Sequence, residues 1–298
     1  MLVRKRTELS SAVVAAPFIV GVARSGTTLL RMMLDAHPQL AIPPETHFIP
    51  EAAAAARGSA ENSRKEFIDC VLGSRFWDDF QLDAETLRRQ VQLLDPFQVG
   101  AALRVFYQLY AERFGKHRWG DKTPTYLTQM RLIAELLPEA CFIHVIRDGR
   151  DVLLSVKGLW FGPASVSESA GTWVNRIQSA RAEAVDLPNY MEIRYEDLVL
   201  DSEKMLRAIC AFLDLPWEPR ILDYHRGAEE RLAEIARDVQ KSGKLVATAK
   251  QRTSIHALTS KQPDATRIGR WKEEMSAADR KEFERIAQPL LADLGYID

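Results

Sequence analysis

The sequence predicts an α/β fold with a central parallel β-sheet flanked by helices. Two patterns lead to this expectation: short apolar runs typical of buried strands alternate with amphipathic helical stretches, and each run passes into a polar turn that opens the next helix. A third observation is the length of 298 residues, which suffices to bury a large core without disulfides or metals. We therefore expect a single domain over residues 1–298.

The expected elements follow one another in a regular order. Apolar, β-branched runs predict strands at Pro17–Val22, Cys141–Ile146 and Tyr190–Tyr195. Apolar residues at helical spacing predict helices at Leu29–Leu34, Ala52–Ala56, residues 64–114, Leu127–Leu137, Glu203–Leu213 and Ala277–Leu294. We expect a helical insertion at about 57–116. The charged stretch 229–250 is expected to be helical or mobile, within a lid-like segment at about 225–265.

Composition excludes several classes of protein. The 40 Lys and Arg residues nearly balance 41 Asp and Glu, so a protein that coats nucleic acid is not expected. Cys70, Cys141 and Cys210 are too scattered for a disulfide framework or a zinc site, which favours a cytoplasmic location. The apolar run Ala12–Val22 is too short to cross a bilayer, so no transmembrane segment is expected. A homodimer is left open.

The turn after the first predicted strand, Gly21–Thr28, has the glycine spacing of a phosphate-binding loop, which makes the expected sheet P-loop-like. Backbone N–H groups and the following helix N-terminus can hold an anion there. Thr27 stands where a Walker A loop has its lysine, so a P-loop kinase or NTPase is kept only as an alternative. Arg24 and Ser25 offer a different set of donors.

A second cationic position follows the second predicted strand. Arg147 comes directly after this strand, and Ser155 lies about two helical turns further on. Ligands of open α/β sheets gather at the carboxyl ends of the strands. One nucleotide with two separated phosphate groups explains both positions.

Further short motifs recur along the chain, at Arg24–Leu29, Met33–Pro38, Pro44–Thr46, Asp121–Pro124, Val145–Arg150, Arg194–Leu198 and Ile268–Trp271. This set resembles the sulfotransferases that use 3′-phosphoadenosine 5′-phosphosulfate (PAPS). The resemblance is closest to the tyrosylprotein sulfotransferase branch and its bacterial relatives. The motifs span most of the chain, but residues 56–118 and 224–252 contribute none.

The resemblance implies a role for each matched residue. The 5′-phosphosulfate is held by Arg24, Ser25, Gly26, Thr27 and Thr28, the 3′-phosphate by Arg147 and Ser155, and further donor contacts come from Tyr195 and Lys261. It implies Glu45 as catalytic base and Lys122 as the group that stabilises the leaving phosphate. PAPS is then the co-substrate, adenosine 3′,5′-bisphosphate the product, and no metal is required. Arg267 and Arg270 are further candidates for the 3′-phosphate. Thr253 and Ser254 are candidates for donor contacts from the same variable loop as Lys261.

The identity of the base has an alternative in His47, whose unperturbed pKa lies near 6.5. We favour Glu45, because it matches the Pro44–Thr46 motif by position, and we expect burial to raise its pKa. His47 replaces a cationic residue of the protein-tyrosine branch, which weakens the case for a tyrosine acceptor.

The acceptor is an unspecified hydroxyl on a small molecule, lipid, glycan or tyrosine. Core packing is favoured over an acceptor pocket for the aromatic residues Phe76, Trp77, Phe80, Phe106, Tyr107 and Tyr110. Trp160 and Phe161 are further candidates for the acceptor site, on the same terms as these aromatic residues. A noncatalytic nucleotide-binding protein is a further alternative.

Overall fold

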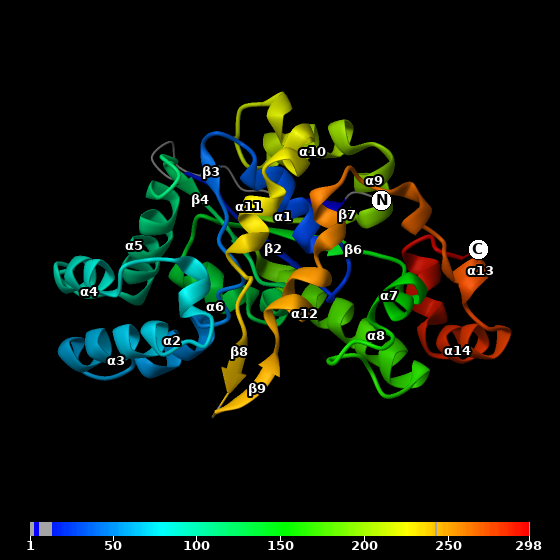
Figure 1. Ribbon diagram of the computed structural model, residues 1–298, viewed down its shortest axis with the longest axis horizontal. Coiled ribbons are helices and arrows are strands. Elements are labelled where there is room, and N and C mark those ends of the chain that lie inside the picture. Colours follow the sequence, from blue (N-terminus) through cyan, green and yellow to red (C-terminus); the bar gives the residue numbers. More distant parts are fainter. Residues whose placement is uncertain (1–2, 6–13, 242, 298) are drawn as a thin grey trace.

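A computed structural model of the chain describes residues 3–5, 14–241 and 243–297, which fold around a five-stranded β-sheet (Figure 1). Its strands lie in the order β1-β7-β6-β2-β5. They are β1 (Val3–Lys5), β2 (Ala16–Gly21), β5 (Asp121–Lys122), β6 (Ala140–Ile146) and β7 (Tyr190–Arg194). β2 pairs in parallel with β5 and β6, and β6 pairs in parallel with β7. The predicted α/β fold with a central parallel sheet is confirmed.

The sheet also contains strands that the sequence did not predict. β1 pairs antiparallel with β7, so one edge of the sheet departs from the parallel pattern. β1 and β5 are too short to give an apolar periodicity of their own, and only the pairing with a neighbour defines them. Within the run Ala12–Val22, residues 12 and 13 lie outside the described residues.

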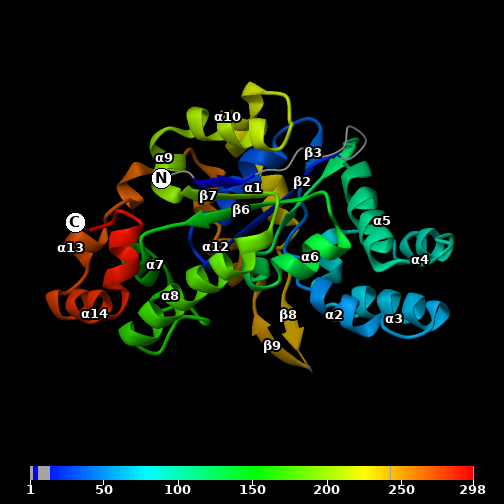
Figure 2. The ribbon, with the colours of Figure 1, turned by 180° about the vertical axis from the view of Figure 1, so that it is seen from behind.

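Helices cover both faces of the sheet, as Figure 2 shows from behind. They are α1 (Thr27–Asp35), α2 (Ile49–Ala55), α3 (Ala60–Leu72), α4 (Ala84–Gln92), α5 (Val99–Glu112), α6 (Met130–Leu136), α7 (Gly149–Val156), α8 (Val166–Glu183), α9 (Tyr195–Leu200), α10 (Ser202–Phe212), α11 (Ala228–Ala233), α12 (Ala249–Ser254), α13 (Trp271–Glu274) and α14 (Ala277–Asp293). The helix predicted at Leu127–Leu137 is divided between the 3₁₀ helix η2 (Pro124–Thr128) and α6. No helix in the described part of the chain is long and apolar enough to span a membrane.

Successive side chains of a strand point to opposite sides of the sheet. In the central strands, the side chains on both sides are buried. Phe18 and Phe142 join an apolar cluster with residues of α2, α3 and α5. Ile19 and Ile143 join a second cluster with residues of α1 and α10. This double burial explains why the strands appear in the sequence as nearly continuous apolar runs.

The interval 57–116, predicted as a helical insertion, contains α3, α4 and α5. Of the six aromatic residues assigned to core packing, four are fully buried in the core: Phe80, Phe106, Tyr107 and Tyr110. Phe76 and Trp77 are only partly buried. The limits of the insertion stay a prediction.

The interval 229–250 differs from the helical or mobile stretch that was expected. It contains the end of α11, the antiparallel hairpin β8 (Val239–Lys241) and β9 (Lys244–Ala247), and the start of α12. Gly243, with φ of 75°, supplies the left-handed conformation that the turn of this hairpin requires. Val239 pairs with Ala247, and both are buried where the hairpin joins the body of the protein.

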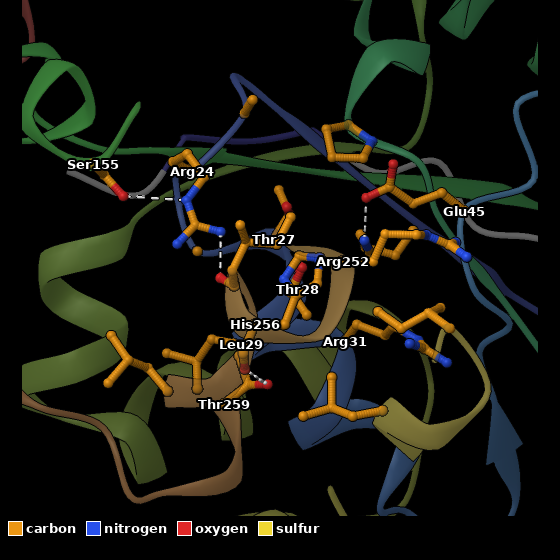
Figure 3. Close-up of a pocket in the computed structure, with 18 of the residues that line it drawn as sticks. Arg24, Thr27, Thr28, Leu29, Arg31, Glu45, Ser155, Arg252, His256 and Thr259 are labelled. Carbon is orange, nitrogen blue, oxygen red and sulfur yellow. Dashed lines mark hydrogen bonds and ion pairs between the residues drawn. The ribbon is translucent and has the colours of Figure 1, made fainter. Parts of the chain in front are cut away.

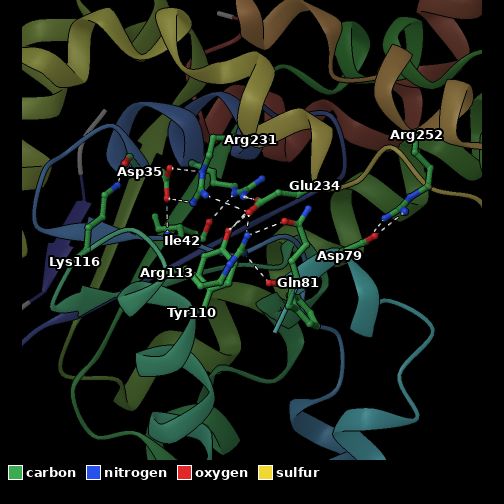
Figure 4. Close-up of polar contacts among 12 residues, drawn as sticks. Asp35, Ile42, Asp79, Gln81, Tyr110, Arg113, Lys116, Arg231, Glu234 and Arg252 are labelled. Atoms are coloured by element: carbon green, nitrogen blue, oxygen red, sulfur yellow. Dashed lines mark hydrogen bonds and ion pairs between the residues drawn. The ribbon is translucent and has the colours of Figure 1, made fainter. Parts of the chain in front are cut away.

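A buried network of ion pairs ties α1 to α5 and α11 (Figure 4). Arg231 donates to both carboxylate oxygens of Asp35 at 2.7 Å, and Arg31 Nη2 lies 3.3 Å from Glu234 Oε2. The Tyr110 hydroxyl donates to the same Glu234 oxygen at 2.9 Å. Burial alone would raise the pKa of Asp35, but the Arg231 charge holds it below its usual range. The network therefore anchors the residues that precede the hairpin onto the first helix.

Removing one charge from this network leaves its partners buried and uncompensated, which costs on the order of 3 kcal/mol. We expect Glu234→Gln to lower the free energy of unfolding by about that amount, measured by urea denaturation. Glu203→Gln is the matched control, because Glu203 pairs with Arg207 on the exposed surface of α10. Equal stability losses in the two variants would contradict an anchoring role for Glu234.

Candidate active site

The loop between β2 and α1 is shaped to hold an anion. Gly26 has φ of 95°, and a Cβ atom there would lie 2.3 Å from Cδ2 of Tyr195, so only glycine fits. Ser25 is fully buried, and its hydroxyl has no hydrogen-bond partner among the described residues. Helix α1 begins directly after this loop, at Thr27. A buried, unpaired hydroxyl beside a helix N-terminus fits a phosphate-like oxyanion at this place.

Two arginines and a serine gather beside this loop. Arg24 Nε donates to Ser155 Oγ at 3.1 Å (Figure 3). Arg147 lies over the Tyr195 ring, with Cζ 4.3 Å from the ring centroid, and its Nη1 donates to the carbonyl of Arg24 at 3.2 Å. Arg147 Nε is buried without a hydrogen-bond partner in the described chain. Burial and the neighbouring Arg147 charge lower the pKa of Arg24. An anion placed here would favour the charged guanidinium and so oppose this shift.

Glu45 and Lys122 form an ion pair between the loop after β3 (Leu40–Ala41) and strand β5. The Lys122 side chain is only 3% exposed, and burial lowers its pKa although Glu45 opposes this shift. The other Glu45 oxygen, Oε2, lies 2.9 Å from His47 Nε2. The His47 ring packs on Phe76 with 4.9 Å between ring centroids. A carboxylate, an ammonium and an imidazole are thus joined in one chain of contacts.

The expectation that burial raises the pKa of Glu45 is wrong in this structure. Burial acts in that direction, but the Lys122 charge and the contact with His47 outweigh it and hold the pKa of Glu45 well below its usual range. No sequence pattern predicts that Glu45 pairs with Lys122, because 77 positions separate them.

Neighbouring residues fix the positions of Glu45 and Lys122. Thr46 follows Glu45 and donates from Oγ1 to Asp121 Oδ2 at 2.8 Å, and Asp121 directly precedes Lys122. Tyr107 also donates to Asp121 Oδ2 at 2.8 Å, and the Tyr126 hydroxyl lies 2.8 Å from Thr46 Oγ1. This fully buried polar cluster locks the two chain segments together, so the ion pair rests on a rigid support.

One cavity of about 830 Å³ connects these groups (Figure 3). All the predicted site residues except the buried Ser25 line it: Arg24, Gly26, Thr27, Thr28, Glu45, Lys122, Arg147, Ser155, Tyr195 and Lys261. Arg267 and Arg270 line it too, and the Arg267 carbonyl accepts from Arg147 Nη2 at 2.8 Å. Among the described residues, no group of three or more His, Cys, Asp or Glu side chains could hold a metal ion.

Two cavity residues escaped the sequence reasoning. His256 lines the cavity near Lys122 and Glu45; burial and the Lys122 charge lower its pKa to about 3. Arg252 pairs with Asp79, which joins α12 to the 3₁₀ helix η1 (Trp77–Phe80). Neither residue belongs to a motif, since each reaches the cavity only through long-range packing.

The nearby hydroxyls of Thr253 and Ser254 do not line the cavity and bond to their own helix instead. Thr253 Oγ1 donates to the Ala249 carbonyl at 3.0 Å, and Ser254 Oγ to the Gln251 carbonyl at 3.0 Å.

A family model described as the sulfotransferase family matches residues 17–219. This interval contains the anion loop, the Glu45–Lys122 pair and the Arg147 position. The chain belongs to the sulfotransferase family. It is therefore a transferase that moves sulfuryl groups, as the sequence motifs indicated.

Named relatives are protein-tyrosine sulfotransferases of animals. Protein-tyrosine sulfotransferase 1 of Danio rerio is 26% identical over 287 residues, which are 94% of this chain and 71% of the relative. The Drosophila melanogaster enzyme is 30% identical over 217 residues, 70% of this chain and 39% of its own length. Protein-tyrosine sulfotransferase A of Caenorhabditis elegans is 30% identical over 220 residues, 70% of this chain and 52% of the relative. This chain thus spans less than two thirds of the fly and worm enzymes.

Solved structures agree on the fold. The sulfotransferase domain of the curacin biosynthetic pathway superposes with a TM-score of 0.58 at 22% identity, covering 94% of this chain and 98% of that domain. The sulfotransferase domain of the Synechococcus olefin synthase gives a TM-score of 0.56 at 21% identity, covering 96% and 98%. At these identities the likeness concerns the fold alone.

We expect Gly26→Ala to weaken binding of adenosine 3′,5′-bisphosphate by about tenfold or more, measured by calorimetry. The added methyl group must displace the Tyr195 ring that supports Arg147, and alanine at φ of 95° adds backbone strain of about 1–3 kcal/mol. Gly171→Ala in α8 is the control, since a Cβ atom there meets nothing within 4 Å. Unchanged binding in the Gly26 variant would show that the contact with Tyr195 does not shape the anion loop.

Proposed function

We propose that this sulfotransferase takes its sulfuryl group from PAPS and passes it to the hydroxyl of an acceptor. One observation carries the proposal: the two-arginine cluster and the Glu45–Lys122 pair line the same cavity. The cluster suits the phosphates of a donor. The pair supplies a base and a cation where the reaction needs them.

The donor would be held at two places. The loop from Arg24 to Thr28, with the α1 N-terminus, faces the 5′-phosphosulfate, and Arg147 with Ser155 faces the 3′-phosphate. Two buried atoms without partners in the described residues, Ser25 Oγ and Arg147 Nε, support this fit. Tyr195 and Lys261 line the same cavity and would make further donor contacts.

Lys122 and Glu45 divide the chemistry of transfer. As the acceptor oxygen bonds to sulfur, the bond from sulfur to the bridging phosphate oxygen breaks, and its electrons stay on that oxygen. The Lys122 ammonium donates to this oxygen and offsets its growing negative charge. Glu45 accepts the proton of the acceptor hydroxyl.

The ion pair gives these two roles a physical link. A donor oxygen that takes over the Lys122 hydrogen bond offsets part of the ammonium charge that helps to hold the pKa of Glu45 low. Burial then raises that pKa, so Glu45 becomes a stronger base when the donor is in place. No step requires a metal ion.

The alternatives from the sequence have less support. The loop has Thr27 where a P-loop kinase or NTPase has its lysine, and the family membership favours sulfuryl over phosphoryl transfer. A noncatalytic binding protein would not need a buried lysine paired with a carboxylate inside the donor cavity.

We extend the proposal to the whole chain. Residues 1–298 form a single sulfotransferase domain, with an insertion at about 57–116 and a lid-like segment at about 225–265. The few, scattered cysteines favour a cytoplasmic location. The acceptor is a hydroxyl compound rather than a nucleic acid, and a homodimer stays open.

We expect Arg147→Ala to weaken the binding of adenosine 3′,5′-bisphosphate about 10- to 100-fold, because the substitution removes charge-assisted hydrogen bonds to the 3′-phosphate. Binding of adenosine 5′-monophosphate, which lacks that phosphate, should change severalfold less. Calorimetric titration of both ligands into both proteins measures the difference. An equal loss for the two ligands would refute the assignment of Arg147 to the 3′-phosphate.

We expect Glu45→Gln to lower kcat by about 10²–10⁴-fold, the usual effect of losing a general base. His47→Gln should lower kcat by less than about tenfold. It should also move the acidic limb of kcat/KM to higher pH, because His47 helps to depress the pKa of Glu45, which must be ionised to act. Transfer of labelled sulfate across a pH series measures both effects. A loss in the His47 variant as large as in the Glu45 variant would assign the base to His47.

A further inference from the structure

Exposed apolar side chains gather at the mouth of the cavity. We define the mouth patch as Trp160, Phe161, Val246 and Leu258, which are 41%, 42%, 39% and 46% exposed. All four line the cavity that contains Glu45. They come from three segments: the loop after α7 and, much later in the chain, strand β9 and the nearby 3₁₀ helix η5 (Ala257–Ser260). Exposed apolar groups that line a cavity suit the binding of an apolar ligand.

The hairpin that carries Val246 protrudes from the body of the protein. The hairpin β8–β9 extends between α2 and α8 in Figure 1, and Figure 2 shows the same from behind. Trp160 and Phe161 pack edge to face, with 4.9 Å between ring centroids. The apolar lining continues inward, through Leu232, Ile235, Val239 and Ala247, which are buried and line the same cavity.

Two of the three arginines that line the Glu45 side of the cavity are already paired with carboxylates. Arg252 is paired with Asp79, and Arg31 with Glu234. Arg75 lies over the Phe76 ring, with Cζ 4.7 Å from the centroid. An acidic peptide needs several unpaired cations around the acceptor hydroxyl, and these lining arginines offer few.

We propose that the acceptor is an alcohol or phenol carried on an extended apolar body. Its hydroxyl meets Glu45, and its apolar part leaves the cavity across the mouth patch. This inference rests on the proposed function, since it names the acceptor of the same site. The hydrophobic effect, rather than charge, then selects the substrate.

The test compares 4-alkylphenols, from methyl to pentyl, and 1-alkanols of increasing length as acceptors of labelled sulfate from PAPS. We expect kcat/KM to rise roughly threefold for each added methylene that reaches the patch. Dissociation constants for the same compounds, measured by calorimetry on the protein loaded with adenosine 3′,5′-bisphosphate, should fall by a similar factor. An acidic tyrosine peptide serves as the competing acceptor.

Substitutions test whether the mouth patch causes the rise of kcat/KM with alkyl length. Trp160→Ala and Val246→Ser should remove most of the advantage of the long compounds and leave the shortest ones within about twofold. Leu200→Ala, at an apolar residue that is 67% exposed and does not line the cavity, should change nothing. Binding of adenosine 3′,5′-bisphosphate should be unchanged in all three variants.

The contrary results distinguish a failure of the proposed function from a failure of this inference. If adenosine 3′,5′-bisphosphate does not bind the unaltered protein, the proposed function itself fails. If it binds but the alkyl compounds show no dependence on length, or neither bind nor accept sulfate, this inference is overturned. A higher kcat/KM for the acidic peptide than for every alkyl compound overturns it as well. Weaker nucleotide binding in the Trp160 variant would assign the patch to the donor base instead.

Discussion

The contact between the Tyr195 ring and Gly26 holds the donor half of the site together. Tyr195 follows β7, Arg147 follows β6 and the anion loop follows β2, and these three strands are parallel neighbours. The ring packs against the loop glycine on one side and supports the Arg147 guanidinium at 4.3 Å. Three strand ends are thereby joined through one aromatic side chain. Rigidity at this edge lets both arginines meet an anion without first being ordered.

The Glu45–Lys122 pair answers a different physical constraint. A lysine that is 3% exposed would lose its proton or destabilise the fold if it had no opposite charge nearby. Glu45 supplies that charge in this structure, and in the proposed reaction the leaving phosphate oxygen supplies it during transfer. The same buried ammonium can serve both partners only because Thr46 and Asp121 keep the two chain segments fixed. The fold thus supports a charge that the chemistry uses.

The sequence predicted the donor half well because that half is local. Three apolar runs became β2, β6 and β7, and the polar residues after each run converged since parallel strands end at one edge. β5 has only two residues, so no strand pattern predicted that Lys122 lies beside β2, and only its role came from a motif resemblance. The direction of the Glu45 pKa shift was missed for the same reason, because it depends on a partner 77 positions away. His256 also reaches the cavity through tertiary contacts.

The two halves of the cavity therefore differ in how they can change. The donor half is built on strand ends that share one hydrophobic core, so a substitution there disturbs the fold and the nucleotide site together. The other half is assembled from the insertion, the hairpin and the loop after α7, joined by side-chain pairs such as Arg252–Asp79. Those segments can exchange surface residues without moving a strand. A formal net charge of -1 is compatible with this division, because cations gather at the donor end while apolar side chains frame the opening. Acceptor preference can then diverge among related chains while the donor site keeps its geometry.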